Sequence, residues 1–507
     1  MVLKNFTKLS GLVSSKHSKN SLWNVFELLV PPAFLLLISP LCIEHLGDEE
    51  FGVWMLLYSF IGLFGALNFG LSDTAVKFIA AKYHGEADVS TINFLTTIIT
   101  VFAALAVLLA TFFYFFSSYL VNDVFEFQPI FVARAELLLQ IGGGWVGLKL
   151  FENGLSSILK GAQRFDVSGR ISLIENITVL IFALIAQQFG FGLNVILVFA
   201  IISVCLGITA FATEIKRIFS IRGSIFGFEF SELKPAASFS FWAWVQGTSG
   251  SIFNQTDKIL VASIISVSNV AIYVVCLQVA QLIQALIAAA TAFLFPVASN
   301  LVALNKNQNI GAIFHQVLAV VIPIVIAMTA FLYLSAETLL VHFFSEEFAQ
   351  KGTTLLQLQV LVFSGTALTA GPYYLMNGAG LIKINVLFAS ASAILILLLS
   401  PMMIEKYGLI GGGYARLFNF FVVSAYFIYT KIKLLPTYPW ASMARLWASY
   451  LVPLSIICYL GSVLTIGTNS LKDLFPCAVL GLAMFVLSIL INGRRSYTIT
   501  ERLNLSP

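Results

Sequence analysis

Long apolar runs, separated by short polar connections, limit the possible folds of this chain more than any other feature. One run begins at Phe51, reads FGVWMLLYSFIGLFGAL, and leads into NFGLSDTAVKF at Asn68–Phe78. About 20 apolar residues cross a bilayer as a helix, whereas barrel strands would alternate over about 10 residues. Only 10% of the 507 residues are charged, against roughly 25% in soluble domains. The runs therefore predict membrane-spanning helices.

We predict an all-α polytopic membrane protein with about 14 transmembrane helices. Their expected spans are 21–42, 51–76, 91–117, 130–158, 170–188, 192–213, 236–264, 267–299, 311–335, 353–378, 382–403, 408–430, 446–467 and 474–492. The connections are too short for a soluble catalytic domain, and no phosphate-binding loop motif is present. The five cysteines are scattered singly, so no metal site is expected. No cofactor and no nucleic acid partner is expected either, and the chain is not expected to be an enzyme.

Lysine and arginine residues are concentrated in alternate connections, beginning with the N-terminal tail. Loops rich in these residues stay on the cytoplasmic side of a membrane. The distribution therefore places both termini of this multi-pass chain in the cytoplasm.

A shift of about 217 to 219 residues matches parts of the sequence to one another. It pairs Trp54 with Tyr273, Gly161-Ala162 with Gly378-Ala379, and QQFGFGLN (187–194) with EKYGLIGG (405–412). Six helices per copy would make two parallel, pseudo-symmetric bundles, with a substrate path between them as in one class of secondary transporter. The predicted organisation is a tail (1–20), an N-lobe (21–220), a C-lobe (234–435), two appended helices (445–492) and a second tail (493–507).

Charged residues inside the predicted spans are the candidate functional residues, because each costs at least ~2.5–3.5 kcal/mol on insertion scales. Basic side chains would attract a phosphate-type anion, and guanidinium groups suit that contact well. We expect the substrate cavity to be lined by Lys77, Lys149, Arg416, Asp73 and Lys258, and we expect ion coupling at Glu27 and Asp257. A plainer interpretation stays open for two pairs, because Asp73/Lys77 and Lys149/Glu152 could neutralise each other along one helix.

The stretch 46–80 resembles the second-helix signature of bacterial polysaccharide-export flippases of the multidrug/oligosaccharidyl-lipid/polysaccharide (MOP) superfamily. Phe51-Gly52-Val53-Trp54 fits the start of that signature, Asn68-Phe69-Gly70-Leu71-Ser72 follows with Asn for Asp and Ser for the last Gly, and Lys77 takes the basic position. NQTDKILVASIISVSNVAIYVVCLQVA (254–280) resembles the seventh-helix Asp-Lys motif, with Ala271 where Gly is usual.

The resemblance implies a V-shaped, MATE-like transporter in the bacterial cytoplasmic (inner) membrane. It implies a flippase for an undecaprenyl-pyrophosphate-linked oligosaccharide, such as an O-antigen or other surface polysaccharide repeat unit. Either H⁺ or Na⁺ is expected if transport is ion-coupled, and a polysaccharide polymerase and ligase of the same pathway are the expected partners. Two alternatives stay open at this point: a drug/cation antiporter of the same superfamily, and a membrane-embedded glycan ligase or polymerase.

Overall fold

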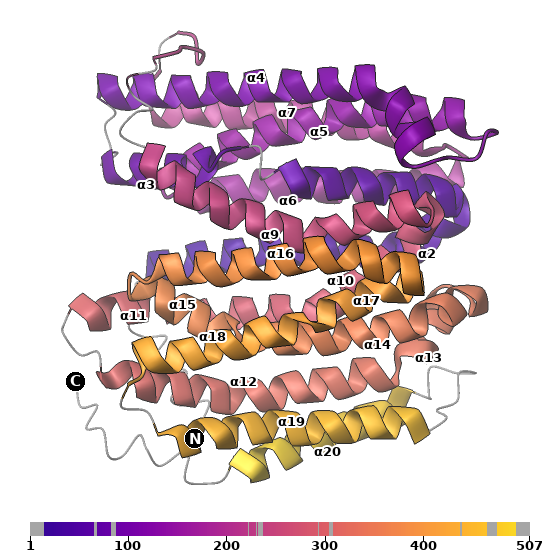
Figure 1. Cartoon of the computed structure of the whole chain (residues 1–507). Coiled ribbons are helices and arrows are strands. Elements are labelled where there is room, and N and C mark those ends of the chain that lie inside the picture. Colours follow the sequence, from indigo (N-terminus) through magenta and orange to yellow (C-terminus); the bar gives the residue numbers. More distant parts are fainter. Residues whose placement is uncertain are drawn as a thin grey trace. The chain divides into compact units, whose positions relative to one another are not determined.

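The described part of the chain is built from helices joined by short turns and contains no strand (Figure 1). This computed structural model describes residues 15–64, 68–82, 88–221, 223–229, 231, 237–292, 294–303, 308–436, 439–463 and 474–492. The first half holds α2 (Ser15–Phe64), α3 (Leu71–Lys82), α4 (Val89–Tyr119), the π-helical turn η1 (Leu120–Val124), α5 (Val132–Gly161), α6 (Phe165–Gln188) and α7 (Leu193–Ile218). The second half holds α9 (Ala237–Ile264), α10 (Val267–Thr291), α11 (Leu294–Ala303), α12 (Gln308–Leu334), α13 (Ala336–Phe343), α14 (Glu346–Leu368), α15 (Ala370–Gly378), α16 (Ile382–Tyr407), α17 (Leu409–Leu417), α18 (Asn419–Leu434), α19 (Trp440–Val463) and α20 (Leu474–Asn492).

Each predicted span overlaps one or two of these helices. Within the described residues, 10 helices are long and apolar enough to cross a membrane. The other four predicted segments fall on α5, on α9 and on the two parts of α2. The helical backbone of α2 is interrupted at Gly47, whose φ of 75° lies in the left-handed region, so α2 is two successive helices. The prediction of an all-helical polytopic chain is confirmed.

The prediction of one unbroken helix over 51–76 is wrong. Helix α2 ends at Phe64, and Asn68, Phe69 and Gly70 form a turn before α3 begins at Leu71. The Asn68 side chain accepts a hydrogen bond from the Gly70 N–H at 2.8 Å, and Gly70 has a φ of 71°. An Asn side chain that bonds the backbone two residues on offers the chain a turn in place of a helix. The Asn-x-Gly sequence was the missed turn signal.

Three other predicted spans are also divided into two helices. The span 267–299 contains α10 and α11, 353–378 contains α14 and α15, and 408–430 contains α17 and α18. Each break leaves the two helices consecutive in the chain, so the order of the predicted segments is unchanged.

Two compact units emerge from the packing of the helices. The first comprises residues 1–255 with 266–268, and the second comprises residues 256–265 with 269–507, so the division falls within α9. The lobe boundaries expected from the sequence, at 220 and 234, stay a prediction. We describe each unit by itself.

Helix α5 is the centre of the first unit, where it packs against α3, α4, α6 and α7. Its glycines allow this close approach. A Cβ atom at Gly143 would lie 2.1 Å from Phe113 of α4, and one at Gly147 would lie 2.5 Å from the Ala106 carbonyl oxygen of the same helix. Small residues on one face are the usual means by which membrane helices approach each other. Helix α5 can therefore be a central spanning helix although it carries several charged residues.

The order of elements and their packing repeat between the two units. Helices α4, α5, α6 and α7 correspond to α12, α14 with α15, α16, and α17 with α18. The pairs α4–α5, α5–α7 and α3–α5 recur as α12–α14, α14–α17 and α11–α15. The repeated packing supports the internal duplication that the sequence offset indicated.

Individual residues repeat as well. A Cβ atom at Gly161 would lie 2.8 Å from Ile79 of α3, and one at the matching Gly378 would lie 2.4 Å from the Phe295 carbonyl oxygen of α11. The residues two positions further on, Gln163 and Gly380, both have positive φ values, of 58° and 78°. Both helices thus end in the same hydrogen-bonded, left-handed C-terminal motif.

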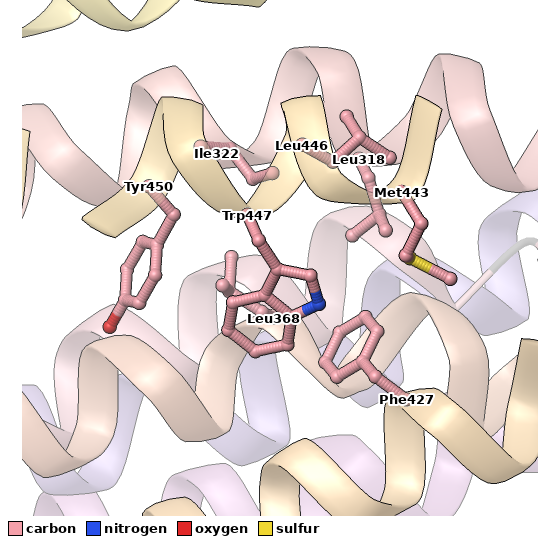
Figure 2. Close-up of a pocket in the computed structure, with 8 residues that line it drawn as sticks. All are labelled: Leu318, Ile322, Leu368, Phe427, Met443, Leu446, Trp447 and Tyr450. Carbon is pink, nitrogen blue, oxygen red and sulfur yellow. The ribbon is translucent and has the colours of Figure 1, made fainter. Parts of the chain in front are cut away.

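The two appended helices, α19 and α20, pack on the second unit, where each contacts α12. The Tyr450 hydroxyl of α19 lies 2.7 Å from the Ser364 hydroxyl of α14, and Ser488 of α20 donates to the Ser449 carbonyl oxygen at 2.9 Å. Figure 2 shows a pocket between α12, α14, α18 and α19 with the Trp447 ring projecting into it. Its lining side chains are all large and hydrophobic: Leu318, Ile322, Leu368, Phe427, Met443, Leu446, Trp447 and Tyr450. This pocket offers no charged group to a polar ligand.

A buried carboxylate joins three helices at one end of the first unit. Glu50 of α2 accepts the Leu193 N–H, at the start of α7, at 2.9 Å, and it forms an ion pair with Arg134 of α5. Replacing Glu50 with alanine is expected to lower the free energy of unfolding by about 1.5–3 kcal/mol, because a hydrogen bond to a charged group is lost. The midpoint of thermal unfolding in detergent measures the change. Glu347→Ala is the control, since Glu347 pairs with Lys351 at the surface of α14. An equal change in both variants would show that Glu50 does not stabilise the contact between α2, α5 and α7.

Candidate functional site

A cluster of one base and two acids lies inside the first unit. Lys149 and Glu152 of α5 are joined at 2.9 Å between Nζ and Oε2, and the Lys149 ammonium also forms an ion pair with Glu175 of α6. The exposed fractions of these side chains are 14% for Lys149, 6% for Glu152 and 2% for Glu175. The sequence placed Lys149 and Glu152 one helical turn apart, and the structure adds Glu175 from the next helix.

The surrounding helices leave room for this cluster by using small residues. A Cβ atom at Gly207 of α7 would lie 2.8 Å from Glu175 Oε2, so the carboxylate occupies the space that a side chain at position 207 would fill. The Tyr58 ring of α2 packs edge-on against Trp145 of α5 with 5.1 Å between centroids, and the Tyr58 hydroxyl interacts electrostatically with both Lys149 and Glu175. The cluster therefore touches four helices of the first unit.

A second buried cluster lies inside the second unit and is centred on Asp257 of α9. Its Oδ2 atom accepts a hydrogen bond from Arg416 Nε of α17 at 2.5 Å, and it accepts another from the Tyr273 hydroxyl of α10. Gln359 of α14 donates to the Tyr273 oxygen at 3.1 Å. The Asp257 and Arg416 side chains are completely buried. Four helices thus contribute to one polar network.

Glycines in α17 bring Arg416 to this position. A Cβ atom at Gly412 would lie 2.7 Å from the Tyr273 ring, and one at Gly413 would lie 3.0 Å from Leu358 of α14. The Arg416 guanidinium also lies 5.6 Å from the centre of the Phe363 ring. The planar guanidinium is thus fixed by a carboxylate on one element and an aromatic face on another, which is the setting to which arginine is better suited than lysine.

The two clusters do not occupy equivalent places in the repeat. The shift of 217 to 219 residues places Lys149 opposite residues 366–368 and Arg416 opposite residues 197–199, none of which is charged. The numbers of acidic and basic side chains also differ between the two clusters. The first cluster has two acids for one base, whereas the second has one acid for Arg416, with Lys258 as its sequence neighbour. The duplicated scaffold therefore carries a different polar centre in each unit.

The remaining predicted site residues lie elsewhere. Asp73 and Lys77 are both exposed on α3, with Asp73 in its first turn, where a negative charge is stabilised by the helix dipole. Lys258 is buried beside Asp257, and its backbone N–H donates to Asp257 Oδ1 at 3.1 Å. Glu27 belongs to α2, but its side chain is outside the described residues.

The structure thus brings together Asp257 with Arg416, and Lys149 with Glu152. The sequence did not predict that Asp257, expected to couple an ion, and Arg416, expected to bind substrate, would form one ion pair across 159 residues. It also did not assign a role to Glu175 or Gln359. The pairing of Tyr273 with Trp54 in the repeat was the available signal for a buried aromatic residue, and both rings are fully buried.

Comparison with known proteins identifies relatives by sequence. Residues 45–351 match a family model described as "Polysaccharide biosynthesis protein". The chain is also 23% identical over 398 residues to a protein of Shigella flexneri named "Putative O-antigen transporter", a match that covers 78% of this chain and 92% of the relative.

Comparison with solved structures identifies the fold. The structure titled "Lipid II flippase MurJ, inward closed conformation" superposes with a TM-score of 0.71 at 16% identity, covering 95% of this chain and 98% of that one. A multidrug resistance MATE family transporter of the MOP superfamily, in its inward-facing conformation, superposes with a TM-score of 0.66 at 14% identity, covering 81% of this chain and 98% of the other. The predicted MATE-like fold is confirmed, and the family match over residues 45–351 confirms the resemblance to polysaccharide-export proteins.

Proposed function

Since this chain belongs to the polysaccharide biosynthesis protein family, we propose that it is a flippase for a lipid-linked oligosaccharide. The substrate would be an O-antigen or similar surface polysaccharide repeat unit on undecaprenyl pyrophosphate, carried across the bacterial cytoplasmic membrane with both protein termini in the cytoplasm. The single observation that carries this proposal is the family match over residues 45–351. The fold supports it, because flippases and drug transporters are built on the same arrangement of helices.

A membrane protein with buried charged side chains is suited to moving a lipid-linked oligosaccharide across the bilayer. The lipid tail of such a substrate can stay in the bilayer, so the protein has to lower the cost only for the charged pyrophosphate and the sugars. Ionisable side chains at membrane depth are costly and usually serve a substrate or ion path. Both units contain such side chains, at Lys149 and at Arg416. A polymerase and a ligase of the same pathway would then use the product.

The contacts of the predicted residues refine their proposed roles. Lys149 and Arg416 are each paired with buried carboxylates. In this proposal they therefore hold the helices in place and contribute positive charge to the interior of each unit. Lys77 and Asp73 are the candidates for direct contact with the substrate because both side chains are exposed on α3, and a contact at Lys258 stays a prediction. Asp257 already accepts three hydrogen bonds, which makes Glu27 the better of the two predicted coupling residues, with H⁺ or Na⁺ as the ion.

Deleting the gene in its host is expected to cause lipid-linked oligosaccharide to accumulate on the cytoplasmic side of the membrane, because translocation stops while synthesis continues. Extraction of lipid-linked sugars, together with the accessibility of the sugars to added glycosidase in inverted and right-side-out vesicles, measures this. Unchanged lipid-linked pools with increased sensitivity to dyes or antibiotics would instead support the drug/cation antiporter, and would reject the flippase.

At the level of residues, Lys77→Met is expected to lower surface glycan by about tenfold or more, since one charged contact with a phosphate is worth roughly 1.5–3 kcal/mol. Quantitative staining of surface glycan in the complemented deletion strain measures the loss, with membrane levels of the protein measured in parallel. Lys351→Met is the matched control, because Lys351 is also an exposed lysine, four residues after an acid on a helix. Equal glycan in the two variants would remove Lys77 from the site.

A further inference from the structure

The cluster of Lys149, Glu152 and Glu175 has an unbalanced charge. If both carboxyl groups were ionised, the single ammonium would leave one negative charge in excess. The Glu175 side chain is 98% buried, since only 2% of it is exposed, and its Oε2 atom has no hydrogen-bond partner within the part of the chain that the structure describes. A buried carboxylate oxygen without a donor is strongly disfavoured, because desolvation penalises the charged form.

We propose that Glu152 and Glu175 together bind one exchangeable proton, which makes this cluster the proton-binding site of the first unit. The proton is taken up from water by one carboxylate, which becomes a carboxylic acid, and it is returned to water when that acid ionises. The other carboxylate stays ionised and paired with Lys149. The cluster then has no net charge when the proton is bound and one negative charge when the proton has been released.

The geometry favours a proton over a metal cation. The Lys149 ammonium lies within bonding distance of both acids, so a positive charge already occupies the position between them. Sodium would have to enter beside this ammonium and would need several further oxygen ligands. A proton needs only one oxygen atom, and Glu175 Oε2 faces Gly207, which presents no side chain.

The neighbouring helices add few titratable groups. Helix α2 contributes Tyr58, which interacts with Lys149 and Glu175. Helix α7 faces Glu175 with Gly207. Among the described residues, Lys149, Glu152 and Tyr58 are therefore the titratable groups that interact with Glu175. This inference rests on the proposed function only in so far as the proton is called the coupling ion of transport.

Infrared difference spectroscopy of the purified full chain in lipid nanodiscs tests the proton site directly. The C=O stretching band of a protonated carboxylic acid should be present between about pH 5 and 8, where exposed carboxyl groups are ionised, and it should shift in deuterated water. Both Glu175→Gln and Glu152→Gln are expected to abolish this band, because either change leaves one carboxylate fully paired with Lys149. Glu50→Gln is the control, since Glu50 is a buried acid already balanced by Arg134, and it should retain the band.

Three results would overturn the proposal. These are a wild-type spectrum without the band, a band that survives both glutamine substitutions, and a band that disappears when Na⁺ is added at constant pH. Thermal unfolding of each variant confirms that it is folded. The gene-deletion experiment reads substrate accumulation and not proton binding, so the proton site and the flippase can fail separately. If the wild-type protein and Glu175→Gln restored surface glycan equally, the proton would not be coupled to transport. The infrared band of the wild-type protein would still show that the proton site exists.

Discussion

Replacing Arg416 with methionine is expected to lower the free energy of unfolding by about 3–5 kcal/mol, because it leaves the Asp257 carboxylate buried without its ionic partner. Both side chains are completely buried, and the Nε–Oδ2 distance is 2.5 Å. From the sequence alone, a change at Arg416 would be expected to stop transport and leave the protein intact. The ion pair changes that expectation, since loss of function would now accompany loss of folded protein. The midpoint of thermal unfolding in detergent measures the effect.

A second substitution separates a structural from a substrate-binding role for Arg416. In the double variant Asp257→Asn with Arg416→Met, neither member of the ion pair is left buried without the other, so most of the lost stability should return. Arg217→Met is the surface control, because Arg217 pairs with Glu214 at an exposed site, where such pairs contribute at most about 1 kcal/mol. If Arg416→Met unfolded at the same temperature as this control, the buried pair would not stabilise the second unit. If the double variant were stable but still failed to export glycan, one of the two residues would act in transport as well.

Replacing Gly70 with alanine is expected to lower the free energy of unfolding by about 2–5 kcal/mol. Two causes add together. A residue with a side chain costs roughly 1–2 kcal/mol in the left-handed region, and Gly70 has a φ of 71°. The added Cβ atom would also lie 2.2 Å from the Ser240 carbonyl oxygen of α9, and overpacking of this kind costs typically about 1–3 kcal/mol. Thermal unfolding in detergent again gives the measurement, together with the amount of protein recovered from the membrane.

Gly190→Ala is the matched control for this second prediction. Gly190 has nearly the same φ, of 69°, but a Cβ atom there would meet nothing within 4 Å. The difference between the two variants therefore isolates the contact with α9 from the backbone strain. Equal destabilisation would show that the close approach at Ser240, which the hydrogen bond between Thr74 and Ser240 at 2.6 Å accompanies, contributes nothing measurable.

Much of the fold could be predicted from the sequence because its signals are local. An apolar run long enough to cross a bilayer has to satisfy its own backbone hydrogen bonds, and a helix does so within one segment. The positions of the helices and the duplication at Gly161 and Gly378 therefore followed from composition and spacing. The turn at Asn68–Gly70 was local too, but its signal is weak inside an apolar run, and the prediction of a continuous helix there was wrong.

For the candidate site, too, the sequence indicated the local features, whereas the contacts between helices needed the folded structure. The order of residues was enough to place Lys149, Asp257 and Arg416 as charges within spanning segments, and to put Lys149 and Glu152 one turn apart on a helix. The meeting of Arg416 with Asp257, and of Glu175 with Lys149, became known from the folded chain. Those contacts join different helices, and they depend on glycines such as Gly207 and Gly412 that let the backbones approach. A charge inside a membrane segment has to be neutralised by some partner, but which partner it finds depends on how the helices pack, and no local sequence pattern encodes that choice.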